Sequence, residues 1–118
     1  MIKKIKVFDS CGEFVYKINP QVDDSVTWCD VIDVATDVNN TTYILCTIVW
    51  LCELGTYGRD VQVFTRSEIC NKFPVSGRWI NRLTVGYDRV FVISWHLIDV
   101  YELSKDQKKK LCCAIVYG

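Results

Sequence analysis

One short pattern occurs three times along this chain: Lys6-Val7-Phe8-Asp9-Ser10, Gln62-Val63-Phe64-Thr65-Arg66-Ser67 and Asp99-Val100-Tyr101-Glu102-Leu103-Ser104. Each copy places a polar residue, a valine and an aromatic residue ahead of a polar turn. The aromatic residues are 56 and 37 positions apart, which brackets the repeat length of ~40–50 residues that is typical of propeller blades. The longer interval contains the stretch Trp50–Asp60, which we interpret as an added loop. The repetition therefore predicts an array of similar structural units.

Between these copies, apolar and polar residues alternate with a period of two, which is typical of β-strands. Helical periodicity is almost absent, and the one candidate, Leu103–Lys110, is polar on all sides and favours a solvated loop. The stretch Thr42–Val49 is apolar on both faces, as expected for a central strand that is buried from both sides. We count ten short strands, each antiparallel to the next. The predicted fold is all-β.

The composition excludes several classes of protein. Half of the 118 residues are hydrophobic and 13% are aromatic, which excludes a disordered or collagen-like chain. Fourteen Lys and Arg balance fourteen Asp and Glu, so the strong positive charge of most nucleic-acid binders is missing. The longest nearly apolar run, Tyr43–Cys52, is too short for a membrane-spanning helix, and the basic N-terminus is not followed by the apolar segment of a signal peptide. We therefore expect a cytoplasmic protein without membrane contact.

No residue pattern indicates catalysis or a cofactor. The seven cysteines form no Cys-x-x-Cys pair and match no zinc spacing, so we expect most of them to be reduced, buried thiols. The single histidine, His96, has no Ser or Cys partner at motif spacing, which argues against a catalytic triad. Five acidic residues follow no ordered ligand spacing and are interpreted as solvated turns: Asp23, Asp24, Asp30, Asp33 and Asp37. We predict no enzyme activity, no metal and no cofactor.

Three stretches carry a likeness to a known family: Arg59-Asp60-Val61-Gln62-Val63-Phe64, Asp88-Arg89-Val90-Phe91-Val92, and Ile5-Lys6-Val7-Phe8-Asp9-Ser10-Cys11-Gly12-Glu13-Phe14-Val15. They resemble NHL repeats, in which an apolar strand is followed by a stretch similar to RVQVF and then by a hairpin between the third and fourth strands. The Asn-His-Leu tripeptide of the family is absent, and His96-Leu97-Ile98 matches it only in its His-Leu pair. The resemblance spans nearly the whole chain. It implies the antiparallel four-stranded blades of an incomplete NHL-like β-propeller.

Mapped onto such blades, the chain comprises a half blade at 1–20, a blade at 21–74 and a blade at 75–118. Propellers close with about 4–8 blades, so two and a half blades cannot form a ring alone. Three interpretations follow: a fragment of a larger propeller, a chain that self-associates to complete a ring, or an open stack of sheets with altered edges. We favour the first two over a self-sufficient monomer.

The stretch from Trp50 to Asp60 is the one feature that exceeds a minimal blade. It offers Trp50, Tyr57 and Arg59, which are residue types enriched at interface hot spots, and we predict that they bind a protein partner. Alternatively, Trp50 completes the buried strand. The predicted function is a non-catalytic module for protein–protein interaction.

The family resemblance adds a role and two alternatives. NHL propellers are often the substrate-recognition arm of tripartite-motif ubiquitin ligases, and some bind RNA through a basic propeller face. RNA binding is our alternative function, although the neutral charge of this chain counts against it. Peptide-amidating lyases also resemble NHL propellers, but they need metal-binding histidines and this chain has one histidine.

Overall fold

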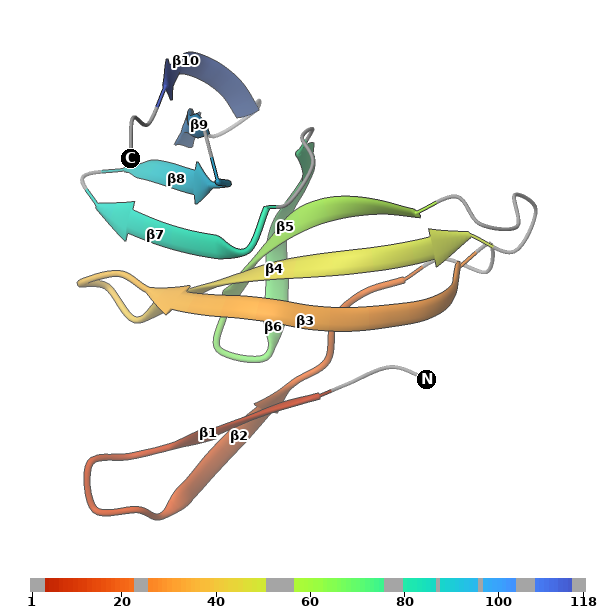
Figure 1. Cartoon of the computed structure of the whole chain (residues 1–118). Coiled ribbons are helices and arrows are strands. Elements are labelled where there is room, and N and C mark those ends of the chain that lie inside the picture. Colours follow the sequence, from red (N-terminus) through yellow and green to blue (C-terminus); the bar gives the residue numbers. More distant parts are fainter. Residues whose placement is uncertain are drawn as a thin grey trace.

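A computed structural model describes residues 4–22, 26–50, 57–75, 80–86, 88–95, 97–103 and 108–115. All of the regular structure in these residues is β, as predicted (Figure 1). Ten strands follow one another along the chain: β1 (Ile5–Phe8), β2 (Phe14–Ile18), β3 (Val26–Thr36), β4 (Thr41–Trp50), β5 (Tyr57–Thr65), β6 (Glu68–Val75), β7 (Arg82–Gly86), β8 (Arg89–Ile93), β9 (Leu97–Leu103) and β10 (Lys108–Ile115). No helix long and apolar enough to cross a membrane is found among the described residues.

The strands form three antiparallel sheets in which sequence neighbours are also neighbours in space. The first is the hairpin β1–β2, and the other two are four-stranded, in the orders β3-β4-β5-β6 and β7-β8-β9-β10. The prediction of ten strands is confirmed, as is their antiparallel succession within each sheet; at β2–β3 and β6–β7 the chain instead crosses from one sheet to the next. Within the part of the chain that the structure describes, the sheets close into neither a barrel nor a ring.

Two stretches that the sequence favoured as loops belong partly to strands. Tyr57–Asp60 opens β5 and pairs with β4, and Lys108–Lys110 opens β10 and pairs with β9. In both places, backbone hydrogen bonds to the neighbouring strand extend the strand beyond the residues that alternate between apolar and polar. The lysines of β10 lie on an edge strand of the third sheet, where charged side chains are well tolerated because they discourage pairing with other chains.

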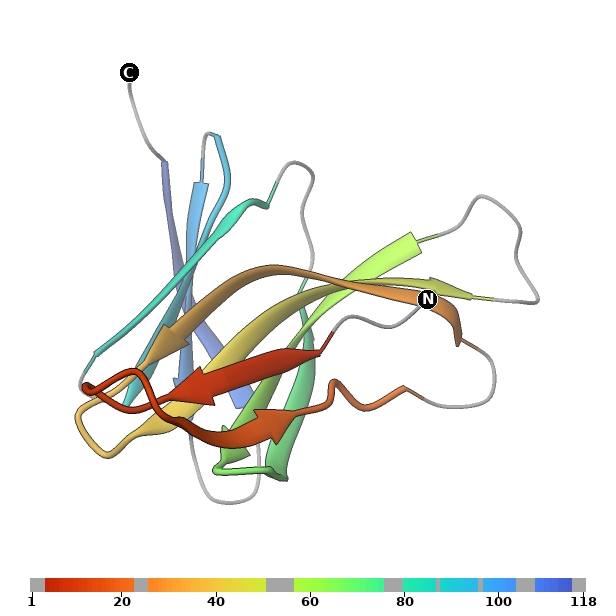
Figure 2. The ribbon, with the colours of Figure 1, turned by 90° about the horizontal axis from the view of Figure 1, so that it is seen from below.

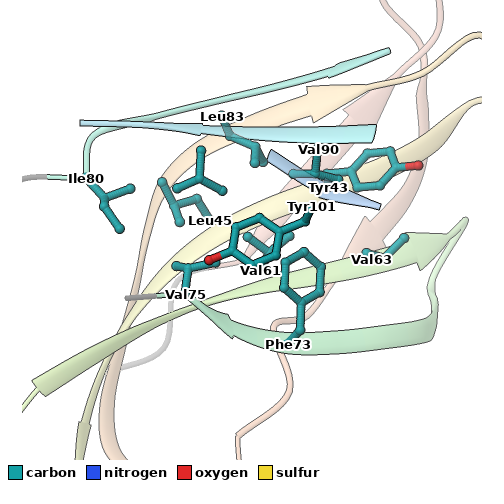
Figure 3. Packing of buried hydrophobic residues seen from close by; sticks show 11 residues of the cluster. Tyr43, Leu45, Val61, Val63, Phe73, Val75, Ile80, Leu83, Val90 and Tyr101 are labelled. Atoms are coloured by element: carbon teal, nitrogen blue, oxygen red, sulfur yellow. The ribbon is translucent and has the colours of Figure 1, made fainter. Parts of the chain in front are cut away.

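The central sheet β3–β6 lies between the hairpin on one face and the sheet β7–β10 on the other (Figures 1 and 2). Facing the hairpin is a core that centres on Ile18, Ile44 and Phe64. Facing the third sheet is a larger core, in which Tyr43, Leu45, Val61, Val63, Phe73 and Val75 pack against Ile80, Leu83, Val90, Val92 and Tyr101 (Figure 3). Successive side chains of β4 and β5 point alternately into the two cores. The sheets stabilise one another because each buries the apolar face of its neighbour.

Strand β4 is deeply buried, as the sequence predicted. Every residue from Thr42 to Cys46 is at most 4% exposed. Ile44 and Cys46 point into the core under the hairpin, whereas Tyr43 and Leu45 point into the core under the third sheet. A strand with covered faces on both sides explains why this stretch has lost the usual polar alternation.

The three sequence copies occupy equivalent places in the structure. In each, the strand that carries the valine and the aromatic residue pairs with the next strand, and the pairing shifts by one residue beside that aromatic residue. The shift lies at Val7/Phe8 on β1, at Val63/Phe64 on β5, and on β10 opposite Val100 and Tyr101. A β-bulge at one position of three hairpins is a structural repeat, because bulges fix the local bend and the register. The sequence repeat is thus also a repeat of backbone geometry.

Candidate functional site

A groove of about 630 Å³ runs along the free edge of β1. All of Ile5–Asp9 lines one side, together with Val15 and Tyr16 of the hairpin. The other side comes from the central sheet, at the end where β3 turns into β4 and β5 turns into β6: Val34, Thr36, Asn39, Asn40, Thr42, Thr65 and Arg66. Three segments that are far apart in the sequence therefore build one surface feature.

Two turns of the same design form the rim of this groove. In the β1–β2 turn, Asp9 Oδ1 accepts hydrogen bonds from the N–H groups of Cys11 and Glu13, both at 2.9 Å. In the β3–β4 turn, Asp37 Oδ1 accepts from the N–H groups of Asn39 and Thr41, at 2.8 and 3.0 Å. An aspartate that binds the backbone ahead of it stabilises a tight turn, so both sides of the rim are preorganised.

Left-handed residues complete these turns. Gly12 and Asn40 occupy the same position after the two aspartates and have φ angles of 83° and 61°. Arg66 in the β5–β6 turn and Asp88 in the β7–β8 turn also have positive φ, at 55° and 64°. Glycine, asparagine and aspartate tolerate this region, but an arginine adopts it at some cost. The cost at Arg66 is offset by a contact of its guanidinium with the Tyr16 ring, 4.8 Å from the ring centroid.

The floor of the groove is apolar and one end is cationic. Ile5, Val7 and Tyr16 are half-buried there, and Val34 keeps 38% of its surface exposed. Arg66 places a positive charge above Tyr16 at the end where the β5–β6 turn lies. Lys6 and Asp9 add charges along the wall formed by β1. An apolar floor with charged groups at its margins suits a side chain or a short peptide segment, because burial supplies affinity and the charges set orientation.

The edge of β1 differs from the edges of its structural equivalents. Strands β5 and β9 each pair on both sides, with β4 and β6 and with β8 and β10. Among the described residues β1 pairs with β2 alone, so its other edge has no partner strand there, and every residue of β1 lines the groove. Such an edge is a template for a further strand.

A second recess of about 490 Å³ lies on the other side of the β3–β4 turn. It is lined by residues of that turn and of the β7–β8 turn: Thr36, Asp37, Val38, Asn39, Val85, Gly86 and Asp88. The turn between the two recesses is held in place by the Tyr43 hydroxyl, which donates to Asp37 Oδ2 at 2.9 Å. Burial and the Asp37 carboxylate together raise the pKa of Tyr43, so this hydroxyl keeps its proton and its role as a donor.

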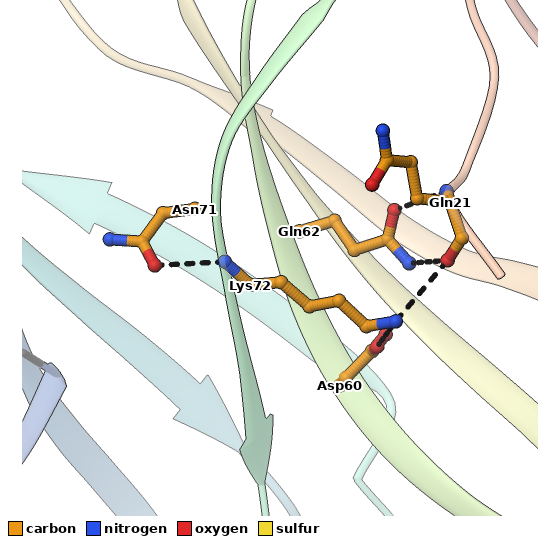
Figure 4. Close-up of polar contacts among 5 residues, drawn as sticks. All are labelled: Gln21, Asp60, Gln62, Asn71 and Lys72. Atoms are coloured by element: carbon orange, nitrogen blue, oxygen red, sulfur yellow. Dashed lines mark hydrogen bonds and ion pairs between the residues drawn. The ribbon is translucent and has the colours of Figure 1, made fainter. Parts of the chain in front are cut away.

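A buried polar network fixes the segment that leads from β2 to β3 (Figure 4). Gln62 is fully buried; its Nε2 donates to the Gln21 carbonyl at 2.8 Å, and the Gln21 N–H donates to its Oε1 at 2.7 Å. Beside it, the Lys72 ammonium lies 3.6 Å from Oδ2 of the buried Asp60. Burial raises the pKa of Asp60 to about 6, and the attraction of Lys72 offsets only part of that effect.

The two buried cysteines near this network, Cys29 and Cys46, lie on adjacent strands and share a hydrogen bond. This bond and burial raise the pKa of the Cys46 thiol. The expectation of buried thiols holds for these two, but it is wrong for Cys11 and Cys70, which are exposed. Cys11 lies in the β1–β2 turn and Cys70 is the bulge residue of β6. The turn and the bulge place both side chains at the surface, although their apolar neighbours in the sequence favour burial.

Of the acidic residues that the sequence favoured as solvated turns, two lie in a strand instead. Asp30 and Asp33 lie within β3, and Asp33 binds the next sheet, because its Oδ2 accepts from the Leu83 N–H at 2.8 Å. Asp37 does lie in a turn. Asp23 and Asp24 lie outside the described residues. Across the described ranges, no three His, Cys, Asp or Glu side chains come together as metal ligands would.

The predicted partner-binding residues lie at the opposite end of the central sheet from the groove (Figure 1). Trp50 ends β4 and Tyr57 begins β5, while the side chains of both, and residues 51–56, lie outside the description. Arg59 is half-buried within β5, where it pairs with Thr47 and Val75. His96 also lies outside the described residues. The interface at Trp50, Tyr57 and Arg59 stays a prediction.

The groove at β1 was not predicted from the sequence, although the two turns on its rim have a recognisable sequence pattern. Asp9 and Asp37 each begin a four-residue turn that ends in a residue tolerant of positive φ, Gly12 or Asn40. That two such turns flank one groove follows from the stacking of the hairpin on the central sheet. No known family model, curated protein or solved structure matches this chain.

Proposed function

We propose that this protein is a non-catalytic module for protein–protein interaction, which takes up an extended segment of its partner along the edge of β1. One observation carries the proposal: a groove of about 630 Å³ follows the full length of a strand edge that pairs with no other strand in the described structure. Main-chain hydrogen bonds to β1 would supply affinity, and alternate side chains would meet Val34 and Tyr16 on the floor. The segment therefore has apolar residues at alternate positions.

We further propose that the sheets are NHL-type blades. The bulge that recurs in three hairpins supports this assignment, as does the succession of a two-stranded and two four-stranded sheets. By that likeness, recognition of substrates for a ubiquitin ligase is the biological role that we favour, and the cytoplasm is the compartment. A second surface at Trp50, Tyr57 and Arg59 belongs to the same proposal.

The test is selection of peptides from a displayed random library against the full chain, followed by affinity measurement with fluorescence anisotropy. Val34→Arg places a charged side chain on the groove floor, and we expect it to weaken the selected peptides about tenfold or more, since a buried charge without a partner is costly. The matched control is Val38→Arg. Val38 is 97% exposed on the adjacent turn, outside the groove, so its substitution leaves affinity unchanged.

Two outcomes would replace this proposal. Failure to retain any peptide, or equal binding by the Val34→Arg variant, removes the groove as the site. Retention of homopolymeric RNA with a steep salt dependence that falls in a Lys6→Gln variant would favour the RNA alternative, because counterion release dominates nucleic-acid binding. Lys6 and Lys17 lie opposite one another on the hairpin, both exposed, and they are the residues that such binding would use.

A further inference from the structure

The structural repeat places the same residue positions on the same faces of the three sheets. Gln62 and Phe64 of β5 face the hairpin and are at most 1% exposed. Asp99 and Tyr101 of β9 hold the equivalent positions, and Tyr101 packs against the central sheet, with Asp99 7% exposed. In each case the sheet that comes earlier in the chain covers the face.

On the hairpin, the same positions lie at the surface. Lys6 and Phe8 are equivalent to Gln62 and Phe64, yet Lys6 is exposed and Phe8 keeps 55% of its surface exposed. Phe14 stacks edge-on against Phe8 with ring centroids 6.0 Å apart and is 52% exposed. We call Lys6, Phe8, Phe14 and Lys17 the hairpin face. It is the counterpart of two faces that are buried by a sheet elsewhere in this structure.

The far side of the third sheet completes the comparison. Val100 pairs with Phe91 and Ile98 with Ile93, just as Val63 pairs with Tyr43 and Val61 with Leu45 in the central sheet. The four residues of the central sheet are buried under the third sheet. Of their equivalents, Phe91, Ile93 and Ile98 are half-buried and Val100 is 7% exposed, and none of the four packs into either core. We call these four residues, Phe91, Ile93, Ile98 and Val100, the terminal-sheet face.

We infer that the hairpin face binds the terminal-sheet face of a second copy of this chain. The contact would repeat the packing that joins the central sheet to its neighbours, with the Phe8 position set against a Val/Ile/aromatic face. Two exposed phenylalanines beside each other and an apolar sheet face are the kind of surfaces that mark interaction sites. Because the two faces differ, the association is head-to-tail, and it ends only if the copies close into a ring.

Two copies satisfy that closure. Each chain contributes three sheets, so two chains bring six sheets together, and closed rings of stacked sheets hold about 4–8. Both faces carry a net positive charge, because Lys6 and Lys17 belong to the hairpin face and Arg82 and Arg89 lie beside Glu102 on the far side of the third sheet. Apolar contact rather than charge must therefore drive the association, and added salt should not weaken it.

The first test is the mass of the full chain in sedimentation velocity at micromolar concentration. We expect a discrete species of twice 13.7 kDa, at least as tight at an ionic strength on the order of 1 M as at 0.1 M. Phe8→Glu and Ile98→Glu each place a charge on one of the two faces and should raise the dissociation constant about tenfold or more. Val38→Glu, on an exposed turn, is the control that leaves the dimer intact.

A cross-linking experiment avoids any dependence on whether the half-buried Ile98 tolerates a charge. A photoreactive benzoylphenylalanine in place of Phe8 should cross-link to β8 or β9 of the other copy. A monomer throughout the micromolar range, or a cross-link to any other element, overturns the inference. A ladder of higher multiples with the expected cross-link would keep the pair of faces but overturn ring closure.

This inference does not rest on the proposed peptide groove. Lys6 and Phe8 line the groove and also belong to the hairpin face, so Phe8→Glu bears on both proposals. Ile98 lies on the far side of the third sheet, and Val34 lies in the groove but in neither of the two faces, so Ile98→Glu tests assembly and Val34→Arg tests peptide binding. Either proposal can therefore fail while the other stands.

Discussion

At the scale of single residues, buried polar groups add to the hold of the apolar cores, as in the connection from β2 to β3, where Val22 also packs against the core under the hairpin. Gln62 has no exposed surface, and both polar atoms of its amide bind the backbone of Gln21. A buried amide without partners costs free energy, whereas this one meets the Gln21 N–H and the Gln21 C=O, which also accepts from the Lys72 ammonium at 3.4 Å. Gln62 therefore joins strand β5 to the connection from β2 to β3 by two hydrogen bonds.

We expect Gln62→Ala to lower the free energy of unfolding by about 2–4 kcal/mol, because two hydrogen bonds are lost and the Gln21 N–H loses its acceptor. Chemical denaturation monitored by tryptophan fluorescence measures this change. Gln21→Ala is the matched control: its backbone makes the bonds and its side chain is exposed, so stability should stay within about 0.5 kcal/mol. Equal losses in both variants would contradict the role of the Gln62 amide.

Asp60 gives the fold a dependence on pH. Its pKa in the folded chain is about 6, above the ordinary value of 3.8, so the folded state holds a proton that the unfolded state releases between these values. Stability from this residue is therefore full below pH 3.8 and falls as the pH rises to 6. The loss is about 3 kcal/mol, since each pKa unit is worth about 1.4 kcal/mol.

Asp60→Asn removes this titration. We expect the difference in unfolding free energy between variant and wild type to shift in favour of the variant as the pH rises from 4 to 6.5. Urea denaturation at several pH values measures that difference. Curves that stay parallel over this range would show that Asp60 does not titrate in the folded protein as described.

At the scale of elements, the hairpin turns show how one local design is used twice. Asp9 and Asp37 bind the same backbone positions ahead of them, and each turn ends in a residue with positive φ. The two turns differ in one respect. Asp37 also accepts the hydrogen bond of the buried Tyr43, which ties the β3–β4 turn to the core beneath it.

This difference sets up a comparison between two variants. Asp9→Ala and Asp37→Ala both remove an oxygen that organises a turn, but Asp37→Ala also leaves the Tyr43 hydroxyl without its acceptor. We expect Asp37→Ala to cost about 1–3 kcal/mol more than Asp9→Ala, as for a buried donor that loses its partner. Thermal unfolding of the two variants measures the difference. Equal losses, or a larger loss in Asp9→Ala, would contradict the role of Tyr43.

At the scale of the whole molecule, stability depends on how the sheets stack. The hairpin and the third sheet cover opposite faces of the central sheet, so each four-stranded sheet depends on a neighbour to bury its apolar side. Asp33 adds a polar link across one of these junctions, because its carboxylate accepts from the Leu83 N–H of β7. It lies at the bulge of β3, which turns its side chain toward the next sheet.

We expect Asp33→Ala to loosen the attachment of the third sheet. The exchange of the Leu83 amide hydrogen should become about tenfold faster or more, since a partly buried N–H loses its acceptor. Asp33→Asn retains a carbonyl oxygen and should restore most of the protection. Hydrogen exchange by NMR measures both variants, and an unchanged Leu83 amide in Asp33→Ala would remove this link between the sheets.

Much of the fold could be predicted because its signals are local. Alternation with a period of two, turn residues and the threefold Val–aromatic pattern predicted an all-β chain of ten strands, with Thr42–Val49 buried on both faces. Within that stretch, Thr42–Cys46 and Ile48 are buried. The prediction of a loop was wrong at Tyr57–Asp60 and at Lys108–Lys110. There, backbone hydrogen bonds to a neighbouring strand continue β-structure into residues whose side chains do not alternate between apolar and polar.

The groove could not be predicted in the same way. Its walls come from β1, from the end of β3 and from the β5–β6 turn, and no spacing along the chain relates them. The sequence repeat likewise could not predict that Phe8 is exposed whereas Phe64 is buried, because both copies have the same local pattern.

The sequence by itself determined the strands, their order and the equivalence of the three repeats, since pairing between neighbours follows from side-chain alternation and turn chemistry. Only the tertiary structure decided which apolar faces are covered, where a strand edge meets a groove, and which of three equivalent aromatic residues stays at the surface. Those properties depend on which sheet lies against which, and burial is a property of the neighbour as much as of the residue.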